Sequence, residues 1–242
     1  MEISPLIPRF VGGSGGRNRS CKAAKVLWFV WFVNSGRRDH APPSLPRLKS
    51  EFALQAVLSR TGANARAIAD QFGAAYVTTA FEHVLADPDV DLVMIATRHD
   101  LHGSMVFKAL QAGKDVFVEK PLTLDPADLD QLGIFYQTEK NPPLLMAGYN
   151  RRFSPAMQRI RELLQDRAAP MIVNYRMNAG YLPPDHWVHS LEGGGRNLGE
   201  ACHIYELFNF LTGSRVRGIQ AVPISPSGKQ YFKNDNFVAN LV

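Results

Sequence analysis

The sequence predicts an α/β protein with a doubly wound parallel sheet, followed by an incomplete α/β domain. Short apolar runs alternate with amphipathic helical stretches from about residue 45 to residue 148, and repeated strand–helix units of this length are typical of a parallel sheet. The run Asp115–Val118 ends in Glu119 and Lys120, which places ionisable groups at the carboxyl end of a strand. Ligands of open α/β sheets bind at those ends. The pattern changes after Gly148, which indicates a second domain.

The strands of the first domain are expected at short apolar runs, because strands covered by helices on both faces are apolar throughout. These runs are Val26–Val33, Leu54–Leu58, Ala75–Val77, Leu92–Ala96, Asp115–Val118 and Leu144–Ala147. The first run has a second interpretation, since Lys22 and Lys25 precede it and it also resembles the apolar core of a signal peptide. We favour the strand, because the run is short, rich in Trp, Phe and Val, and far from Met1.

The intervening helices are expected where apolar residues recur three and four positions apart. Ala65, Ile68, Ala69 and Phe72 form one such stripe, and Gly73 ends it. Further helices are expected over Phe81–Leu85, over the stripe Met105, Val106, Ala109 and Leu110 before Gly113, and after the capping pair Asp125 and Pro126, with Leu129, Leu132 and Phe135 or Tyr136 facing inward. Strand and helix therefore alternate through the first domain.

The second domain is expected to combine two helices with a short sheet. Ser154 and Pro155 begin one helix, and its buried side is expected to hold Met157, Ile160, Leu163 and Leu164. A later helix begins near Leu198 and buries Ala201, Ile204, Phe208 and Leu211, and strands are expected at Met171–Met177, Gly218–Val222 and Phe237–Val242. A sheet that ends at its second or third strand leaves a long unpaired edge, so we expect a truncated domain. The sequence thus divides into an atypical or disordered N-terminal segment (1–44), a first domain (45–148) and a truncated second domain (149–242).

Composition and charge exclude several classes of protein. The first fifty residues hold nine Lys/Arg against two acidic residues, and the other 192 hold 18 against 20, so the net charge of +5 comes from the N-terminal segment. The folded body is therefore not the basic surface of a nucleic-acid-binding protein. No apolar stretch is long enough to span a membrane. Cys21 and Cys202 cannot form a disulfide framework, so we expect a cytoplasmic protein.

A polar cluster follows the predicted strand Leu92–Ala96. It contains Thr97, Arg98, His99, Asp100 and His102. Such groups at a strand end can bind a phosphate or a ribose. The His-x-x-His spacing also suggests a metal site, but no third ligand with suitable spacing follows, so we expect no metal. His102 is expected at the N-terminus of the next helix, near a bound cofactor.

Two further groups lie after predicted strands. Glu119 and Lys120 are either a solvated charge pair before a turn or part of a ligand site, where a lysine can donate hydrogen bonds to a substrate hydroxyl or carbonyl. Asn150, Arg151 and Arg152 are either a polar linker or a clamp for anionic groups. Spacing alone leaves both alternatives open.

A third group combines glycines with a helical histidine. Three consecutive glycines, residues 193–195, let the backbone approach a ligand closely. Glu200 and His203 lie three residues apart on the following helix and share one face of it. A histidine on a helix is usually structural, but one beside a glycine run can serve as a general acid or base.

Three motifs together resemble the Gfo/Idh/MocA family of NAD(P)-dependent oxidoreductases. They are Glu119-Lys120-Pro121, the segment from Gly148 to Phe153, and the glycines 193–195 followed by a helix with His203. Residues 96–102, 150–155 and 199–203 are most similar to a bacterial branch that also occurs as a domain fused behind a zinc-type alcohol dehydrogenase. The resemblance runs from about Leu45 to the C-terminus. It implies a Rossmann-like dinucleotide-binding domain over residues 45–148 and a substrate and dimerisation domain with an open, largely antiparallel sheet over 149–242.

The resemblance also implies hydride transfer between NAD(P) and a hydroxyl-bearing carbon of a sugar, cyclitol or related polyol. Lys120 would orient the reacting hydroxyl, and His203 would transfer its proton. Cofactor contacts are then expected from Ser59, Arg60, Thr97, Arg98, His102, Glu119, Lys120, Pro121 and Asn150, and substrate contacts from Arg151, Arg152 and Glu200. No nucleic acid or membrane partner is expected, and the C-terminal sheet is a candidate homo-oligomer surface.

The chain departs from the family pattern in two places. Gly199 stands where the family often has an aspartate four residues before the histidine, Glu200 is displaced from that position by one, and Glu206 replaces an aspartate three residues after the histidine. The family also has a Gly-x-Gly-x-x-Gly/Ala turn after its first strand, whereas residues 34–43 hold one glycine and two prolines. Proline removes backbone donors and breaks helices. The hypothesis is that residues before about Leu45 are not native family sequence.

Cofactor choice and activity stay open. Ser59 and Arg60 end the second strand, where an acidic residue usually holds the adenosine ribose, and this pair suits a 2′-phosphate better, so the sequence favours NADP over NAD. The sequence shows no recognisable phosphate-binding turn, so two alternatives stay open. The chain is either an oxidoreductase or a non-catalytic protein, that is, a truncated homologue or a binding module.

Overall fold

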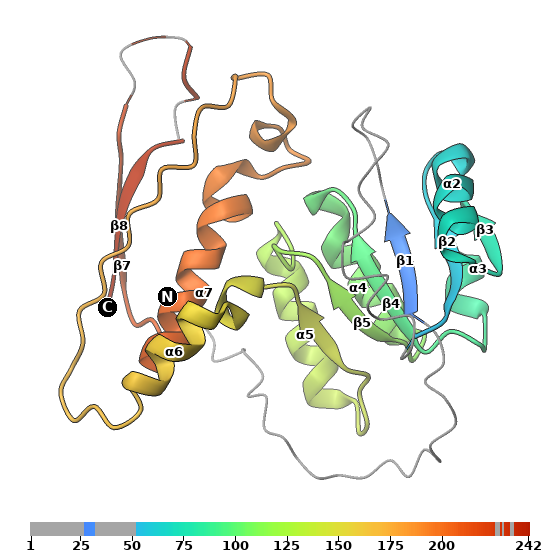
Figure 1. Ribbon diagram of the computed structural model, residues 1–242, viewed down its shortest axis with the longest axis horizontal. Coiled ribbons are helices and arrows are strands. Elements are labelled where there is room, and N and C mark those ends of the chain that lie inside the picture. The colour runs from blue at the N-terminus through green and yellow to red at the C-terminus, as the bar shows by residue number, and fades with distance from the viewer. Residues whose placement is uncertain (1–26, 32–51, 226–227, 229, 233–234) are drawn as a thin grey trace. The chain divides into compact units, whose positions relative to one another are not determined.

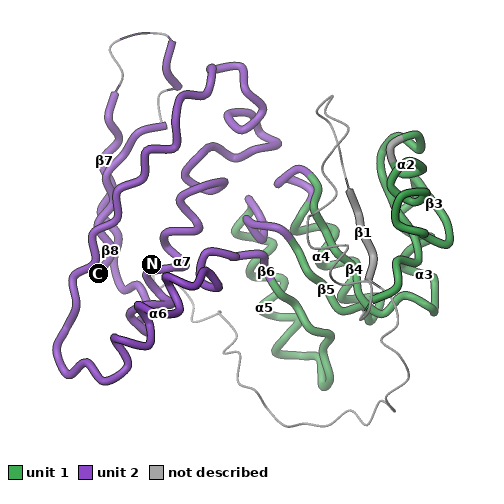
Figure 2. The backbone as a smooth tube through the Cα atoms, viewed as in Figure 1, with its two compact units in different colours: residues 1–97, 102–118, 125–146 green, residues 98–101, 119–124, 147–242 purple. Residues whose placement is uncertain are grey.

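The computed structural model describes residues 27–31, 52–225, 228, 230–232 and 235–242. The chain forms two compact units (Figure 2), the first drawn from residues 1–97, 102–118 and 125–146 and the second from 98–101, 119–124 and 147–242. Most of the atypical segment 1–44 lies outside the described residues, and the domain boundaries expected at 45 and 149 stay predictions.

The first unit is built on a six-stranded sheet in the order β3-β2-β1-β4-β5-β6 (Figure 1). Its strands are β1 (Leu27–Trp31), β2 (Leu54–Leu58), β3 (Tyr76–Thr78), β4 (Leu92–Ala96), β5 (Asp115–Val118) and β6 (Leu145–Ala147). The strands from β3 through β5 pair in parallel. The doubly wound parallel sheet is therefore confirmed, and the first apolar run is a strand in it.

Four helices alternate with these strands, and local capping explains their limits. They are α2 (Gly62–Phe72), α3 (Phe81–Ala86), α4 (His102–Gln111) and α5 (Pro126–Thr138). α2 ends at Gly73, which has φ 76°, and the Asp125 side chain caps α5 by accepting from the Ala127 N–H. Leu132 is buried as expected, but Leu129 is 47% exposed, so its predicted inward position is wrong.

Lys114 fastens the loop after α3 to the start of β5. Its side chain is buried, and Nζ donates to the carbonyls of Asp87 (2.7 Å) and Val90 (2.9 Å). The Asp87 carboxylate accepts from Tyr76 Oη (2.9 Å) and lies 3.5 Å from Gln55 Nε2. These contacts tie the loop to β2, β3 and β5.

We expect Lys114→Met to lower the free energy of unfolding by about 2 kcal/mol, because the partly buried Asp87 carbonyl and the buried Val90 carbonyl lose charge-assisted hydrogen bonds. Urea unfolding followed by circular dichroism measures the change. Lys140→Met is the matched control, since Lys140 is an exposed lysine of the same unit. Equal stabilities for the two variants would show that the Lys114 contacts contribute nothing.

The second unit combines short helical turns, two helices and a two-stranded antiparallel sheet. Its elements are η2 (Asn150–Phe153), α6 (Pro155–Leu163), η3 (Trp187–His189), the π-helical turn η4 (Asn197–Ala201), α7 (Cys202–Thr212), β7 (Ile219–Pro223) and β8 (Phe237–Leu241). α7 buries Ile204 and Leu207, and Gly213 ends it with φ 68°. A mixed α/β unit with a small antiparallel sheet was expected and is confirmed.

Two expectations for this unit are wrong. Met171–Met177 is not a strand, because its alternating pattern finds no paired strand in the part of the chain that the structure describes. The predicted inner side of α6 is not buried either, since Ile160 is 38% and Leu163 68% exposed. In α7, Phe208 and Leu211 are half-buried, not fully buried. Among the described helices, none is long and apolar enough to cross a membrane.

Candidate active site

Lys120 follows β5 and is held by a backbone carbonyl of the π-helical turn η4. Its Nζ donates to the Gly199 carbonyl at 2.7 Å and lies 4.0 Å from Glu200 Oε1. The Lys120 side chain is 19% exposed, and its peptide bond to Pro121 is cis. Glu119 is exposed, whereas Pro121 is buried. The ammonium is therefore partly enclosed, with one of its donors committed to Gly199.

The glycines before η4 allow a close backbone approach that side chains would block. A Cβ at Gly193 would collide with the backbone of Val188. Gly194 and Gly195 have φ 69° and 82°, in the left-handed region that favours glycine. A Cβ at Gly194 would also lie 2.5 Å from a methyl carbon of Leu124. Packing at Gly193 and Gly194, together with the left-handed backbone of Gly194 and Gly195, thus explains the glycine run without a ligand.

His203 lies in the first turn of α7 and is neutral at physiological pH. The residue is 6% exposed, and burial, followed by the charges of Lys120 and Arg151, lowers its pKa to about 4. Its ring meets Tyr149 edge to face at 6.2 Å. Nδ1 is buried and has no hydrogen-bond partner among the described residues. A neutral imidazole in this setting can accept a proton at its other nitrogen, Nε2.

Two neighbours of His203 stay protonated. Burial, together with Cys202, raises the pKa of Tyr149 to about 12. Burial also raises the pKa of the Cys202 thiol to about 11, against the charges of Lys120 and Arg151. Of the ionisable groups beside His203, these two are thus neutral near pH 7. Tyr149 lies inside one of the three motifs but was not singled out from the sequence.

Asn150, Arg151 and Arg152 form the turn η2 and take different positions. Asn150 is exposed. Arg151 Nη1 donates to Tyr175 Oη at 3.3 Å. Arg152 makes an ion pair with the largely buried Glu206 and lies over the Phe210 ring at 5.2 Å. Arg152, predicted to contact substrate, is therefore engaged with α7, and Glu206 is its carboxylate partner.

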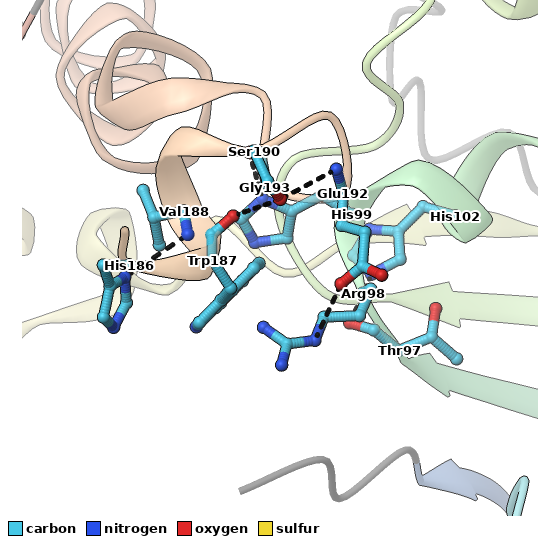
Figure 3. Close-up of polar contacts among 10 residues, drawn as sticks. All are labelled: Thr97, Arg98, His99, His102, His186, Trp187, Val188, Ser190, Glu192 and Gly193. Atoms are coloured by element: carbon cyan, nitrogen blue, oxygen red, sulfur yellow. Dashed lines mark hydrogen bonds and ion pairs between the residues drawn. The ribbon is translucent and has the colours of Figure 1, made fainter. Parts of the chain in front are cut away.

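The segment after β4 packs against the loop that carries the glycines (Figure 3). Arg98 Nε lies 3.6 Å from Glu192 Oε2, and its guanidinium carbon is 3.9 Å from the centre of the Trp187 ring. The Asp100 N–H donates to the Glu192 carbonyl at 3.2 Å. Nothing local in the sequence identified Trp187 or Glu192 as partners of Arg98.

The remaining predicted cofactor residues lie in the first unit. Thr97 follows β4, and its carbonyl lies 3.2 Å from Nε2 of the fully buried His102 at the start of α4. Ser59 is buried at the end of β2, and its hydroxyl donates to the Thr61 carbonyl. Arg60 beside it is exposed. In the described part of the chain, no three His, Cys, Asp or Glu residues gather in a way that would hold a metal ion.

The second unit therefore brings together Lys120, Arg151, Glu200 and His203, whereas Ser59, Arg60, Thr97 and His102 belong to the first unit. Their functional roles stay predictions.

Comparison with known proteins identifies the family. Residues 34–146 match the Gfo/Idh/MocA model, described as an oxidoreductase family with an NAD-binding Rossmann fold. The human protein named glucose-fructose oxidoreductase domain-containing protein 2 is 30% identical over 194 residues, which are 77% of this chain and 49% of that protein. The chain belongs to the Gfo/Idh/MocA oxidoreductase family. The match begins at residue 34, before the limit near Leu45 that the sequence suggested.

Other members of the Gfo/Idh/MocA family extend the comparison. Myo-inositol 2-dehydrogenase of Thermotoga maritima is 27% identical over 140 residues, 57% of this chain and 41% of that protein. The crystal structure of a putative myo-inositol dehydrogenase from Sinorhizobium meliloti 1021 matches with a TM-score of 0.59 and 26% identity, over 75% of this chain and 54% of that one. An oxidoreductase structure from Thermotoga maritima shares the fold, with a TM-score of 0.69 and 21% identity over 90% and 68%. The chain spans about half the length of the curated relatives it matches.

The strand order of the described sheet is one that binds dinucleotides, as the Gfo/Idh/MocA fold implies. Its order reverses between β1 and β4, and dinucleotides bind at the carboxyl ends of the strands beside such a reversal. Thr97 directly follows β4, and Ser59 and Arg60 follow β2. Residues 32–51, where the phosphate-binding turn was expected, lie outside the described residues. The inferred loss of that turn therefore stays a prediction.

Proposed function

We propose that the protein is an oxidoreductase that transfers a hydride between NAD(P) and a hydroxyl-bearing carbon of a sugar, cyclitol or related polyol. The observation that carries the proposal is the pairing of a fixed ammonium with a neutral imidazole. Lys120 is hydrogen-bonded to Gly199, and His203 lies within the influence of its charge in the same unit. A hydrogen-bond donor beside a proton acceptor is what oxidation of an alcohol requires.

In this proposal, each residue has a distinct role in alcohol oxidation. A bound nicotinamide would supply the hydride acceptor for this direction and the hydride donor for the reverse direction. Lys120 donates a hydrogen bond to the substrate oxygen and stabilises the negative charge that develops there. Nε2 of His203 takes the hydroxyl proton, because Nδ1 is buried and the ring is neutral above its pKa of about 4. A carbonyl compound results, and the proton stays on His203 until solvent removes it.

The names of relatives suggest which substrates to try. Relatives include proteins named myo-inositol 2-dehydrogenase and scyllo-inositol 2-dehydrogenase (NAD(+)). The test mixes the purified chain with NAD or NADP and follows nicotinamide fluorescence, then adds inositols and aldoses and follows nicotinamide absorbance. Binding and turnover with one polyol are expected. Absence of any signal at millimolar cofactor would instead support a non-catalytic homologue or binding module.

We expect Arg60 to favour NADP. Arg60 is exposed and follows β2, at the place where an acidic residue usually holds the adenosine ribose, and its guanidinium suits a 2′-phosphate. Arg60→Asp is expected to weaken NADP binding about tenfold relative to NAD, the effect of losing one charge-assisted contact. Fluorescence titration with both cofactors measures the ratio. Arg66→Asp, which changes an exposed arginine on α2, is the control, and an unchanged ratio in Arg60→Asp removes the argument.

The homo-oligomer and the cytoplasmic location stay predictions. The β7 and β8 strands expose the cross-strand pair Val222 (67%) and Val238 (58%) on one face of their sheet, and Ile219 (59%) on the opposite face. Exposed apolar surface is often covered by a partner protein. Light scattering of the purified chain measures its mass and tests the expected self-association.

A further inference from the structure

His99 is a buried residue that links three parts of the second unit. It is 9% exposed, and its Nδ1 lies 2.8 Å from the Gly193 carbonyl, 94 positions away in the sequence. A carbonyl can only accept, so the proton of this bond is assigned to Nδ1. The ring also meets Trp187 edge to face at 5.1 Å (Figure 3). The position and orientation of the imidazole are therefore fixed from two sides.

The ring of His99 also lies close to Gly199. A Cβ added at Gly199 would lie 3.1 Å from Cε1 of His99 and 3.6 Å from its Nδ1. These separations mean that the histidine ring occupies the space beside Gly199 that a side chain there would need. Position 199 is one where the sequence departs from the family pattern. The ring of His99 lies where a side chain at that position would begin.

The backbone of Gly199 connects His99 to the candidate site. Its carbonyl accepts the 2.7 Å hydrogen bond from Lys120 Nζ. An ammonium has three donors and rotates freely about its carbon–nitrogen bond unless an acceptor holds it. The Gly199 carbonyl is such an acceptor, and the His99 ring supports the turn that presents it. His99, Gly199 and Lys120 thus form a continuous chain of contacts.

We infer that His99 is a positioning residue, which holds the turn η4 so that the Gly199 carbonyl orients the Lys120 ammonium toward a substrate oxygen. This inference rests on the proposed function of Lys120. His99 touches neither substrate nor cofactor in this role and acts only through Gly199. A histidine that merely filled the core would stabilise the fold without any particular coupling to Lys120.

The first test is a double-mutant cycle of His99→Asn with Lys120→Ala. Asparagine keeps a donor near the Nδ1 position but removes the ring that packs against Gly199. We expect His99→Asn to lower kcat about tenfold while KM changes little, since the loss concerns orientation in the bound complex. In the Lys120→Ala chain, the same substitution should change kcat less than about twofold. Equal effects in both chains would overturn the inference.

The second test does not need activity, so it separates failure of this inference from failure of the proposed function. Reductive methylation of the purified chain, followed by mass spectrometry, measures how fast each lysine reacts. Releasing Lys120 from Gly199 should make it react about threefold faster in His99→Asn, as loss of a partial hydrogen-bond constraint implies. The exposed Lys140 is the internal reference. An unchanged Lys120 rate would overturn the inference even in an inactive chain.

Folding is checked by thermal unfolding of each variant. If His99→Asn does not unfold cooperatively, His99→Leu takes its place, because leucine fills part of the same space and also lacks the ring beside Gly199 and the donor to the Gly193 carbonyl. The same two measurements then apply, with the same outcomes for and against. A chain that turns over no polyol but shows the faster Lys120 reaction would refute the proposed function and keep the positioning of Lys120 by His99.

Discussion

Lys120→Ala is expected to lower kcat by roughly 10²- to 10³-fold, the usual cost of removing one donor to a developing oxyanion. The lysine is partly enclosed and is aimed by the Gly199 carbonyl, so water does not easily take over its hydrogen bond to the substrate. Cofactor affinity should change little, because the loss falls mainly on the transition state. Steady-state kinetics with the best polyol and fluorescence titration of the cofactor measure the two effects.

Lys140→Ala is the matched control for this variant, since it removes an exposed lysine of the first unit. It should keep wild-type kinetics. Lys120→Arg gives a second comparison, because a guanidinium keeps the charge but has a different, planar donor geometry. Wild-type turnover in Lys120→Ala would contradict the proposed role of the lysine.

His203→Ala is expected to lower kcat by roughly 10²- to 10⁴-fold, the range for loss of a general acid or base. In the unsubstituted chain, the pKa of His203 lies at about 4, because of burial and then the charges of Lys120 and Arg151. The imidazole is thus neutral over most of the working range. As far as His203 controls activity, kcat/KM for alcohol oxidation should fall only as the pH drops toward 4, and not near the ordinary value of 6.5. A pH–rate profile with an acid limb near 6.5 would contradict the assignment.

The same pKa shift predicts how stability depends on pH. The folded pKa is lowered, so the unfolded chain binds a proton at His203 before the folded chain does. The free energy of unfolding should therefore decline as the pH falls from 6.5 to about 4, and this contribution should be absent in His203→Ala. Urea unfolding at several pH values measures it. His83→Ala is the control for this measurement, because it removes a histidine of α3 in the first unit.

Full activity of the double variant Lys120→Ala and His203→Ala would refute the catalytic roles of both residues.

Much of the first unit was predictable because its signals are local. The limits of β2, β4 and β5 match the apolar runs, and the αL glycine Gly73 and the capping residue Asp125 fix helix ends through contacts a few residues away. The second unit was predicted less well. Alternation at Met171–Met177 is only a preference, and a strand also needs neighbours for its backbone hydrogen bonds.

The sequence by itself determined the alternation of strand and helix, the helix caps and the motifs that placed Lys120 and His203 among the candidates. Only the tertiary structure decided which residues meet. Lys120 and Gly199 are 79 positions apart, and His99 and Gly193 are 94 apart, so no local periodicity encodes their contacts. The same holds for Arg152 and Glu206, whose ion pair joins η2 to α7, and the substrate contact expected of Arg152 stays a prediction. The physical reason is that such contacts form when chain closure and packing bring distant segments together, and the sequence pattern around each residue reports only on its own helix or strand.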